Sequence, residues 1–183
     1  MATPPPAPRD PRHRVFLGLG SNLGDREEHL REALARLAPH ARVVAVSPLY
    51  ETEPWGVAPQ PRFLNAVAEV ETALAPRALL DALKGIEAAL GREVAAVGAP
   101  REVDLDVLYF DRVVSDEPGL VIPHPRLHLR AFVLAPLADL ASDLVDPRLG
   151  RRVRDLLAAL PEGERAGVRR VAPEWPGTRP TGA

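Results

Sequence analysis

The chain has 183 residues, and 23 Lys or Arg against 25 Asp or Glu give it a net charge of -2 at pH 7. This near balance gives no reason to expect a nucleic acid or an acidic membrane as a partner, and the absence of cysteine excludes disulfides, thiolate metal sites and a cysteine nucleophile. Since no apolar run reaches membrane-spanning length and the start of the chain lacks the apolar core of a secretory signal, we expect one cytoplasmic domain.

Both ends of the chain have the composition of flexible segments. Prolines, which fix φ and lack a backbone donor, dominate residues 1–13, and beyond residue 160 Gly, Pro and charge replace the apolar periodicity. We therefore expect a flexible Pro-rich N-terminus over 1–13, a folded domain over 14–160 and a flexible tail over 161–183. Trp175 is the exception in this tail and is a candidate to dock on the domain.

The folded part begins with a strand and a helix. Arg14–Gly20 is short and apolar, which predicts a buried strand. A helix is expected from Arg26 to about Leu37, because Asp25 can cap it and Glu28 stands in the capping-box position.

Further strands and a second helix follow. Val43–Tyr50 predicts a strand, and three prolines and a glycine in Glu53–Arg62 predict a long loop. Phe63–Glu71 alternates as a strand does. Pro76 can begin a helix that runs to about Leu90, and Gly91 can end it.

The last predicted elements complete a recognisable order. A second loop is expected over Glu93–Pro100, a strand over Glu102–Phe110, and helical segments near Arg126–Ala141 and Arg151–Leu160. The order β-α-β-β-α-β is that of the ferredoxin-like, split βαβ arrangement. We thus predict an α+β fold in which helices pack on a mainly antiparallel four-stranded sheet and extra helices follow at the C-terminus.

The most informative motif is the aspartate pair in the last predicted strand. Residues two apart in a strand point to the same face, so Asp104 and Asp106 project side by side while Leu105 and Val107 face the other way. Paired carboxylates repel each other unless a cation neutralises them, and Mg²⁺ favours carboxylate and phosphate oxygens. Arg101 could contact such a phosphate. A solvated acidic strand is the alternative interpretation.

Other motifs are ambiguous when taken alone. G-L-G-S-N-L-G-D at 18–25 fails the dinucleotide fingerprint, because Leu23 stands where glycine is needed, and a tight turn before a helix explains it equally well. Thr52 and Asn65 could read the polar edge of a flat heterocycle and Phe63 could stack on it, but core and turn roles are the simpler explanation for these residues.

The remaining charged candidates also have structural explanations. His124 and His128 lie four residues apart, but no H-E-x-x-H motif is present, and a lone histidine is usually structural. Arg130 could grip phosphate or be a surface charge. Glu87 and Arg92 could form a surface pair at a helix end.

Taken in order along the chain, these strings resemble the 6-hydroxymethyl-7,8-dihydropterin pyrophosphokinase family over roughly residues 15–160. The matching runs are G-L-G-S-N-L-G-D at 18–25, Y-E-T-E-P-W-G at 50–56, F-L-N-A at 63–66, I-E…G-R at 86–92, P-R-E-V-D-L-D at 100–106 and P-H-P-R…R-A-F at 123–132. The resemblance implies a ferredoxin-like fold and transfer of diphosphate from ATP to the hydroxymethyl group of a dihydropterin, with release of AMP.

The resemblance also implies a role for individual residues. Asp104 and Asp106 would hold two Mg²⁺ ions and form the catalytic group together with Arg101. The implied pterin-binding residues are Thr52, Glu53, Trp55, Phe63, Asn65 and Phe132. The implied ATP-binding residues are Lys84, Glu87, Arg92, Arg101, Val107, His124 and Arg130. Small-molecule substrates and a monomer are expected, with no nucleic acid and no membrane.

The second predicted loop departs from the family pattern. Between Arg92 and Arg101 the chain lacks a tryptophan and two arginines that the family usually carries, and the loop is one residue shorter. We expect weaker closure over the substrates and slower turnover. This departure leaves open a non-catalytic pterin- or nucleotide-binding homologue, and a ferredoxin-like interaction domain with an incidental D-x-D is a more distant alternative.

Overall fold

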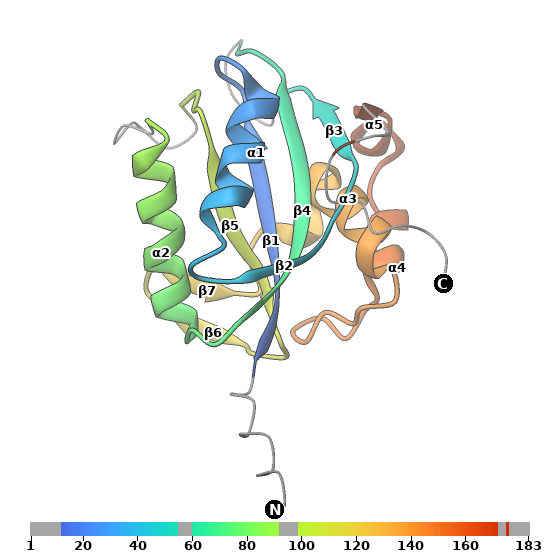
Figure 1. Cartoon of the computed structure of the whole chain (residues 1–183). Helices are drawn as coiled ribbons and strands as arrows, with labels where there is room; N and C mark the ends of the chain where they lie inside the picture. Colours follow the sequence, from blue (N-terminus) through green and yellow to red (C-terminus); the bar gives the residue numbers. More distant parts are fainter. Residues whose placement is uncertain (1–11, 55–59, 92–98, 172–174, 176–183) are drawn as a thin grey trace, which may run out of the picture.

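The sheet and its helices account for most of the chain. The computed structural model of the protein describes residues 12–54, 60–91, 99–171 and 175. Six strands form one sheet in the order β5-β1-β4-β3-β8, with β2 also pairing with β4, and every pairing is antiparallel (Figure 1). The strands of this sheet are β1 (His13–Ser21), β2 (Arg42–Val46), β3 (Leu49–Thr52), β4 (Phe63–Thr72), β5 (Asp104–Phe110) and β8 (Val168–Val171).

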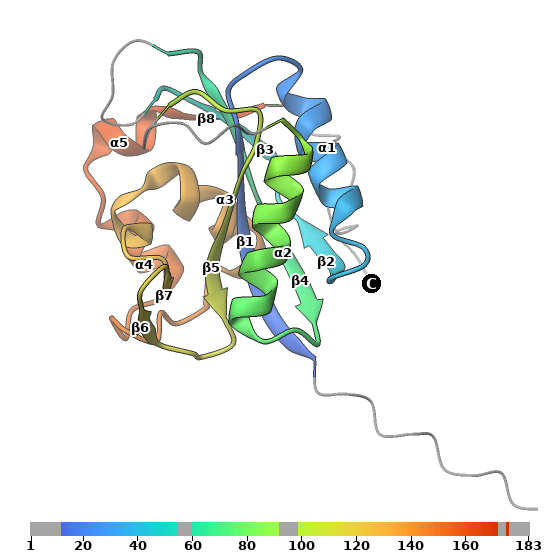
Figure 2. The same cartoon turned by 90° about the vertical axis from the view of Figure 1, so that its left-hand side faces the viewer.

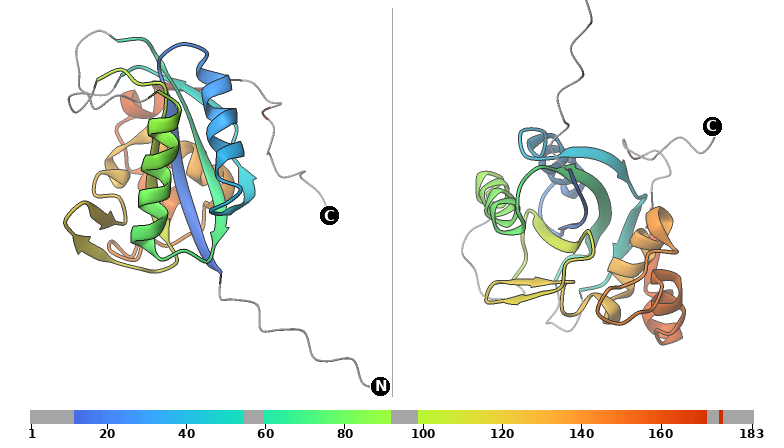
Figure 3. Two further views of the ribbon diagram at one scale, coloured as in Figure 1. Left: turned by 60° about the vertical axis from the view of Figure 1, so that its left-hand side comes forward. Right: turned by 90° about the horizontal axis from the view of Figure 1, so that it is seen from below.

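Helices cover both faces of the sheet. The helices are α1 (Arg26–Arg36), α2 (Pro76–Ala89), the short 3₁₀ turn η1 (Leu127–Leu129), α3 (Ala131–Ala141), α4 (Val153–Ala158) and α5 (Glu162–Ala166). Figure 2 shows α1 and α2 on one side of the sheet and α3 and α4 on the other, next to a small hairpin of β6 (Ser115–Glu117) and β7 (Leu120–Ile122). In Figure 3, α1 and α2 lie side by side along the strands.

The two faces bury separate apolar clusters. Leu30 and Ala33 of α1 and Leu83 of α2 pack with inward-facing residues of β1, β4 and β5. On the opposite face, Leu134 and Leu137 of α3 pack with residues such as Phe16 and Leu108. The central strands β1 and β4 are therefore covered on both sides, which gives a rigid platform for the polar residues at their ends.

The predicted α+β fold is confirmed, as are several local signals. The core order is β-α-β-β-β-α-β, because the predicted second strand is divided in two, and the last strand of this core, β5, lies beside the first, β1. With β8 added, the sheet has six strands instead of the predicted four. Asp25 caps α1, since its side chain accepts from the Glu28 N–H at 3.1 Å. Pro76 begins α2, and Gly91 follows its end at φ 92°, a left-handed conformation that favours glycine.

The prediction of one strand over Val43–Tyr50 was wrong, because the structure has β2 and β3 in its place, separated at Ser47 and Pro48. Proline has no N–H to donate to a sheet, so the ladder is interrupted there. The Ser47 hydroxyl fills the gap: it accepts from the Val67 N–H of β4 at 2.9 Å and donates to the Pro48 carbonyl at 2.9 Å. Both short strands consequently stay on β4.

The folded part extends beyond residues 14–160, where the sequence placed its boundaries. His13 already belongs to β1 and pairs with Thr72. After residue 160, α5 and β8 follow, and β8 adds a strand to the edge of β3. Trp175 is 1% exposed and belongs to the core cluster under α1, which confirms that it docks on the domain. Flexibility of residues 1–11 and 176–183, which lie outside the described residues, stays a prediction.

Two further features bear on function. No helix among the described residues is long and apolar enough to cross a membrane. Of the two predicted loops, the described parts, including Glu53, Pro54 and residues 60–62, have neither helix nor strand, and the rest lies outside the described residues.

Candidate functional site

The predicted site residues gather at one end of the sheet. Because β1 runs antiparallel to β4 and β5, the end of β1 lies beside the beginnings of the other two strands. β3 also ends there, beside the start of β4 (Figure 1). Four strands thereby bring together residues that are far apart in sequence. Ser21 and Asp106, for example, are separated by 85 positions.

Gly20 of β1 lies at the centre of this end. It pairs with Asn65 of β4 on one side and with Asp104 of β5 on the other. A Cβ atom at this position would meet the Asn65 Oδ1 at 3.2 Å, the Phe63 ring at 3.7 Å and the Asp104 Cβ at 4.0 Å. Because Gly20 has no side chain, the residues predicted to bind the pterin and those predicted to bind the metal can face the same space.

The aspartate pair has the geometry that the strand pattern predicts. Asp104 and Asp106 are partly buried on one face of β5, whereas Leu105 and Val107 are buried in the core on the other. Burial, and then the neighbouring Asp104, raises the pKa of Asp106 to about 6. Lys84 and Arg130 oppose this rise in the pKa only in part, so their charges do not offset the burial of Asp106.

Two arginines connect the aspartates to the two predicted stacking rings. Arg101 lies 3.1 Å from Asp104 through its guanidinium and 5.9 Å from the centre of the Phe63 ring. Arg130 lies 5.5 Å from the centre of the Phe132 ring, and the charges of Asp106 and Asp104 act on it. Burial, followed by Arg126, lowers the pKa of Arg130. The aromatic and acidic residues therefore belong to one cluster.

Thr52 and Asn65 form a buried polar pair between β3 and β4. The Asn65 amide donates to the Thr52 hydroxyl at 2.8 Å, and both side chains are almost completely buried. This bond orients the Asn65 carbonyl oxygen toward the space above Gly20. Glu53 differs, since its side chain is mostly exposed and pairs with Arg62 at 2.5 Å. Its carboxylate therefore lies at the surface, outside the buried Thr52–Asn65 pair.

His124 is neutral at physiological pH. Burial, followed by the charges of Arg130 and Arg126, lowers the pKa of His124 to about 4. Its Nδ1 accepts from the Arg126 N–H at 3.3 Å, which leaves Nε2 to carry the proton. The charge of Asp104 also acts on the pKa of His124, so His124 lies near the aspartate pair. A neutral imidazole of this tautomer can donate a hydrogen bond but adds no charge.

Glu87 and Lys84 of α2 lie behind β5. Glu87 is 2% exposed and accepts from the Lys84 ammonium at 3.0 Å and from the Leu105 N–H at 2.7 Å. Its carboxylate therefore holds the free edge of β5 to α2, which the surface-pair interpretation did not anticipate. The Val107 side chain is buried in the core, so the predicted adenine contact would have to use its backbone, whose N–H points to the same edge as that of Leu105.

Of the remaining site candidates, two fall in stretches outside the described residues and one was not predicted. Trp55 and Arg92 lie outside the described residues. Asn22, at the end of β1, was treated only as part of a turn motif, yet it is buried and bonded to both segments that flank the site. Its partners at 60–61 and 101 are distant in sequence, so no local signal could have identified them.

The carboxylates of the candidate site suit Mg²⁺, which needs few protein ligands, better than a cation that protein side chains coordinate on all sides. Among the described residues, no group of three or more His, Asp or Glu side chains is arranged to hold a metal ion. Mg²⁺ commonly takes one or two carboxylates and completes its shell with water and substrate phosphate. Two carboxylates on one face of β5, Asp104 and Asp106, meet that requirement.

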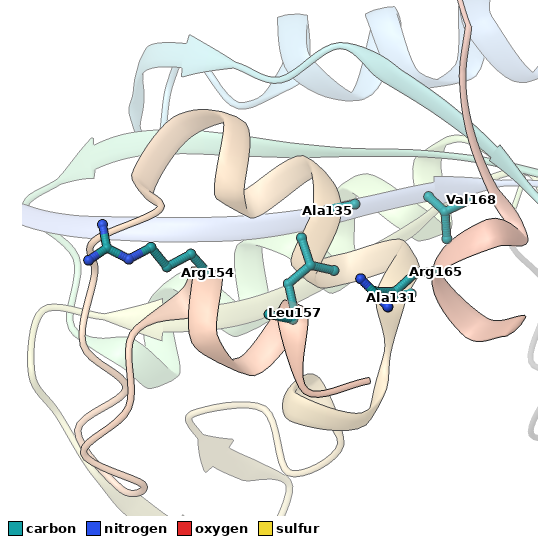
Figure 4. Close-up of a pocket in the computed structure, with 7 residues that line it drawn as sticks. Ala131, Ala135, Arg154, Leu157, Arg165 and Val168 are labelled. Carbon is teal, nitrogen blue, oxygen red and sulfur yellow. The ribbon is translucent and has the colours of Figure 1, made fainter. Parts of the chain in front are cut away.

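A separate cavity lies on the other side of α3. It measures about 290 Å³ between α3, α4, α5 and β8 (Figure 4), and is lined by Ala131, Ala135, Arg154, Leu157, Ala158, Arg165 and Val168. None of these seven residues is a predicted site residue, although Ala131 lies between Arg130 and Phe132 in sequence. The cavity is mostly apolar and lacks the carboxylates of the candidate site.

Known proteins resemble this chain in both sequence and structure. The model of the family described as 7,8-dihydro-6-hydroxymethylpterin-pyrophosphokinase (HPPK) matches residues 16–142. Two relatives bear the name 2-amino-4-hydroxy-6-hydroxymethyldihydropteridine pyrophosphokinase. The one from Pseudomonas aeruginosa is 50% identical over 150 residues, covering 81% of this chain and 92% of the relative. The one from Methylorubrum extorquens is 45% identical over 160 residues, covering 86% and 98%.

A solved structure shares the fold. An HPPK-DHPS crystal structure from Plasmodium falciparum aligns with a TM-score of 0.69 at 16% identity, over 83% of this chain. The alignment covers 46% of that longer chain, so this chain spans less than half of its length.

Proposed function

Because the chain belongs to the 7,8-dihydro-6-hydroxymethylpterin-pyrophosphokinase family, we propose that the cluster around Gly20 is where it transfers diphosphate from ATP to 6-hydroxymethyl-7,8-dihydropterin. The chain is a pyrophosphokinase of folate biosynthesis. The observation that carries the site assignment is the strand register, which sets Asn65 and Asp104 on either side of one glycine.

Asp104 and Asp106 would hold Mg²⁺, with two ions expected. When bound, Mg²⁺ supplies positive charge that offsets the phosphate oxygens and helps to orient them. The chain supplies the rest of the electrostatics: Arg101 and Arg130 are close enough to the aspartates to bind phosphate oxygens, and neutral His124 can donate a hydrogen bond to one. Arg101 would have to leave Asp104 in order to do so.

The pterin would lie on the Gly20 side of the cluster. Phe63 and Phe132 offer aromatic faces for its ring, and the Asn65 carbonyl oxygen, fixed by Thr52, offers an acceptor for its amino edge. With both substrates held against one platform, the hydroxymethyl oxygen and the β-phosphorus can be brought together, so that positioning and charge stabilisation provide the acceleration.

An AMP-release assay tests this proposal. AMP should form only when ATP, the hydroxymethyldihydropterin and Mg²⁺ are all present. Asp104→Ala and Asp106→Ala should abolish it while the far-UV circular dichroism stays unchanged. Asp116→Ala, which removes an exposed aspartate of β6, is the matched control and should keep full activity.

Two outcomes would contradict it. Wild-type AMP formation in either aspartate variant would refute the metal assignment. Pterin and ATP binding without AMP would favour the non-catalytic homologue.

A monomeric state, a cytoplasmic location and the slower turnover expected from the shortened 92–101 loop stay predictions from the sequence.

A further inference from the structure

Asn22 is a buried polar residue that none of the roles above uses. It follows the last residue of β1, is 1% exposed, and makes hydrogen bonds in two directions. From this arrangement we propose that Asn22 is a positioning residue of the transfer reaction, which fixes the segment carrying the pterin-stacking Phe63 relative to the segment carrying the phosphate-binding Arg101. The inference rests on the substrate assignments of those two residues in the preceding subsection.

Asn22 holds Arg101 at two points. Its backbone N–H donates to the Arg101 carbonyl at 3.1 Å, and its side-chain Oδ1 accepts from the Arg101 N–H at 2.8 Å. Together these bonds fix both the place and the direction of the backbone at Arg101. The guanidinium of that residue then reaches Asp104 on one side and the Phe63 ring on the other.

The same side chain also holds the segment before Phe63. Its Nδ2 donates to the Gln60 side-chain oxygen at 3.2 Å and to the Pro61 carbonyl at 3.2 Å. Arg26 of α1 adds a bond from its guanidinium to the Arg62 carbonyl at 2.8 Å. The end of the first loop is thus tied to the end of β1 immediately before Phe63 begins β4.

Only an amide fits all these partners at this reach. The Arg101 N–H needs an acceptor, while the Pro61 carbonyl needs a donor, and asparagine provides one of each. Aspartate would keep the bond to Arg101 but place a second acceptor against the Pro61 carbonyl, which has no donor to offer. Alanine would remove both side-chain arms and leave only the backbone bond to Arg101. The two substitutions therefore separate the arms.

Steady-state kinetics of AMP formation can detect this separation. Asn22→Asp should raise KM for the pterin by about tenfold, because a carboxylate oxygen would face the Pro61 carbonyl in place of a donor, and should leave KM for ATP within about twofold. Asn22→Ala should raise both KM values and lower kcat. A residue that served stability alone would change the amount of folded enzyme and leave both KM values unaltered.

Thr72→Val is the matched control. Thr72 is a buried side chain at the opposite end of β4, and it also bonds two backbone groups, the His40 carbonyl at 2.7 Å and the Leu74 N–H at 3.0 Å. Its loss should lower the unfolding midpoint without changing either KM. If the Asn22 variants fail to fold, Gln60→Ala alters the same arm from the other side and should raise KM for the pterin alone.

The failure of this inference differs from the failure of the site assignment. Wild-type KM values in Asn22→Asp, or an equal rise in Thr72→Val, would overturn the role of Asn22. Phe63→Ala, measured in parallel, should raise KM for the pterin strongly. If it does not, the assignment of Phe63 is what fails, and the role of Asn22 falls with it.

Discussion

Asp106 illustrates how a functional residue can reduce the stability of the fold that holds it. The pKa of Asp106 is about 6 in the folded protein, against an ordinary value of 3.8. Between these two pH values the folded protein keeps a proton that the unfolded chain releases, so the free energy of unfolding falls as pH rises through this window. Above pH 6 the full cost of the buried charge remains.

Asp106→Asn should therefore stabilise the metal-free protein while abolishing AMP formation. At pH 8 we expect the free energy of unfolding to increase by up to about 3 kcal/mol, and below about pH 3 the gain should vanish because Asp106 is then protonated in both the folded and the unfolded protein. Urea unfolding at the two pH values measures the difference, with the exposed Asp116→Asn as control. An equal or lower stability at pH 8 would show that Asp106 is not under electrostatic strain.

Gly20 makes a sharper test of how the two halves of the site share space. In Gly20→Ala the new methyl group would lie 3.2 Å from the Asn65 Oδ1, and the bond to Thr52 limits how far Asn65 can move away. We expect KM for the pterin to rise by about tenfold or more. In Gly18→Ala, two residues earlier on the same strand, the nearest atoms belong to the core residue Leu108, at 3.3 Å, and none belongs to a predicted substrate residue, so the effect on KM should be much smaller. Equal effects of the two substitutions would contradict a specific role for Gly20.

At the residue scale, the sequence predicted what local geometry determines. The shared face of Asp104 and Asp106 follows from the two-residue period of a strand and needs no tertiary information. The roles of Gly20 and Asn22 depend on strand register and on loops that meet in space, so they could not be predicted from the sequence. The neutrality of His124 likewise depends on burial and on two arginines that only the fold brings near it.

At the element scale, the prediction was wrong for one strand, where a tertiary contact replaces a local rule. Val43–Tyr50 has the apolar pattern of one strand, but Pro48 removes a donor, and the Ser47 hydroxyl takes over the bond to the Val67 N–H. A side chain here performs the work of a backbone group, which no periodicity reveals. The capped start of α1 and the proline start of α2 were predicted because their signals are local.

Ser47→Ala should consequently destabilise the protein more than a surface substitution does. It would leave the Val67 N–H buried in the central strand β4 without its acceptor, which costs about 1–3 kcal/mol. Chemical denaturation should show this loss, and the KM values should stay within about twofold because the printed bonds of the Ser47 hydroxyl go to Val67 and Pro48 and to none of the predicted substrate residues. Ser115→Ala, in the exposed β6 hairpin, is the control and should be nearly neutral. A neutral result for Ser47→Ala would mean that the strand break needs no side-chain support.

At the scale of the whole molecule, the C-terminal segment adds an edge strand to the sheet and a core residue, Trp175, to the face that α1 covers. β8 adds to β3, which carries Thr52, and Arg169 of β8 reaches Glu51 at 2.8 Å. Three arginines, Arg26, Arg62 and Arg169, share that one carboxylate, and the bond from Arg169 is the largest contribution that lowers the pKa of Glu51. The tail is thus tied to the first loop and to α1 rather than appended to a finished domain.

Trp175 anchors this segment on the face that α1 covers. Its ring is 1% exposed, belongs to the core cluster with Leu30 and Ala33, and lies 5.1 Å beneath the Arg31 guanidinium. Trp175→Ala should lower the free energy of unfolding by about 3–5 kcal/mol, as expected when a large buried ring is removed. Because the Trp175 Nε1 finds no hydrogen-bond partner among the described residues, Trp175→Phe removes only volume and should cost far less. Urea unfolding of the two variants measures the loss in the free energy of unfolding. If Trp175→Ala is as stable as the wild type, Trp175 does not contribute to the stability of the core. A domain that ends at β8 would then be the correct description.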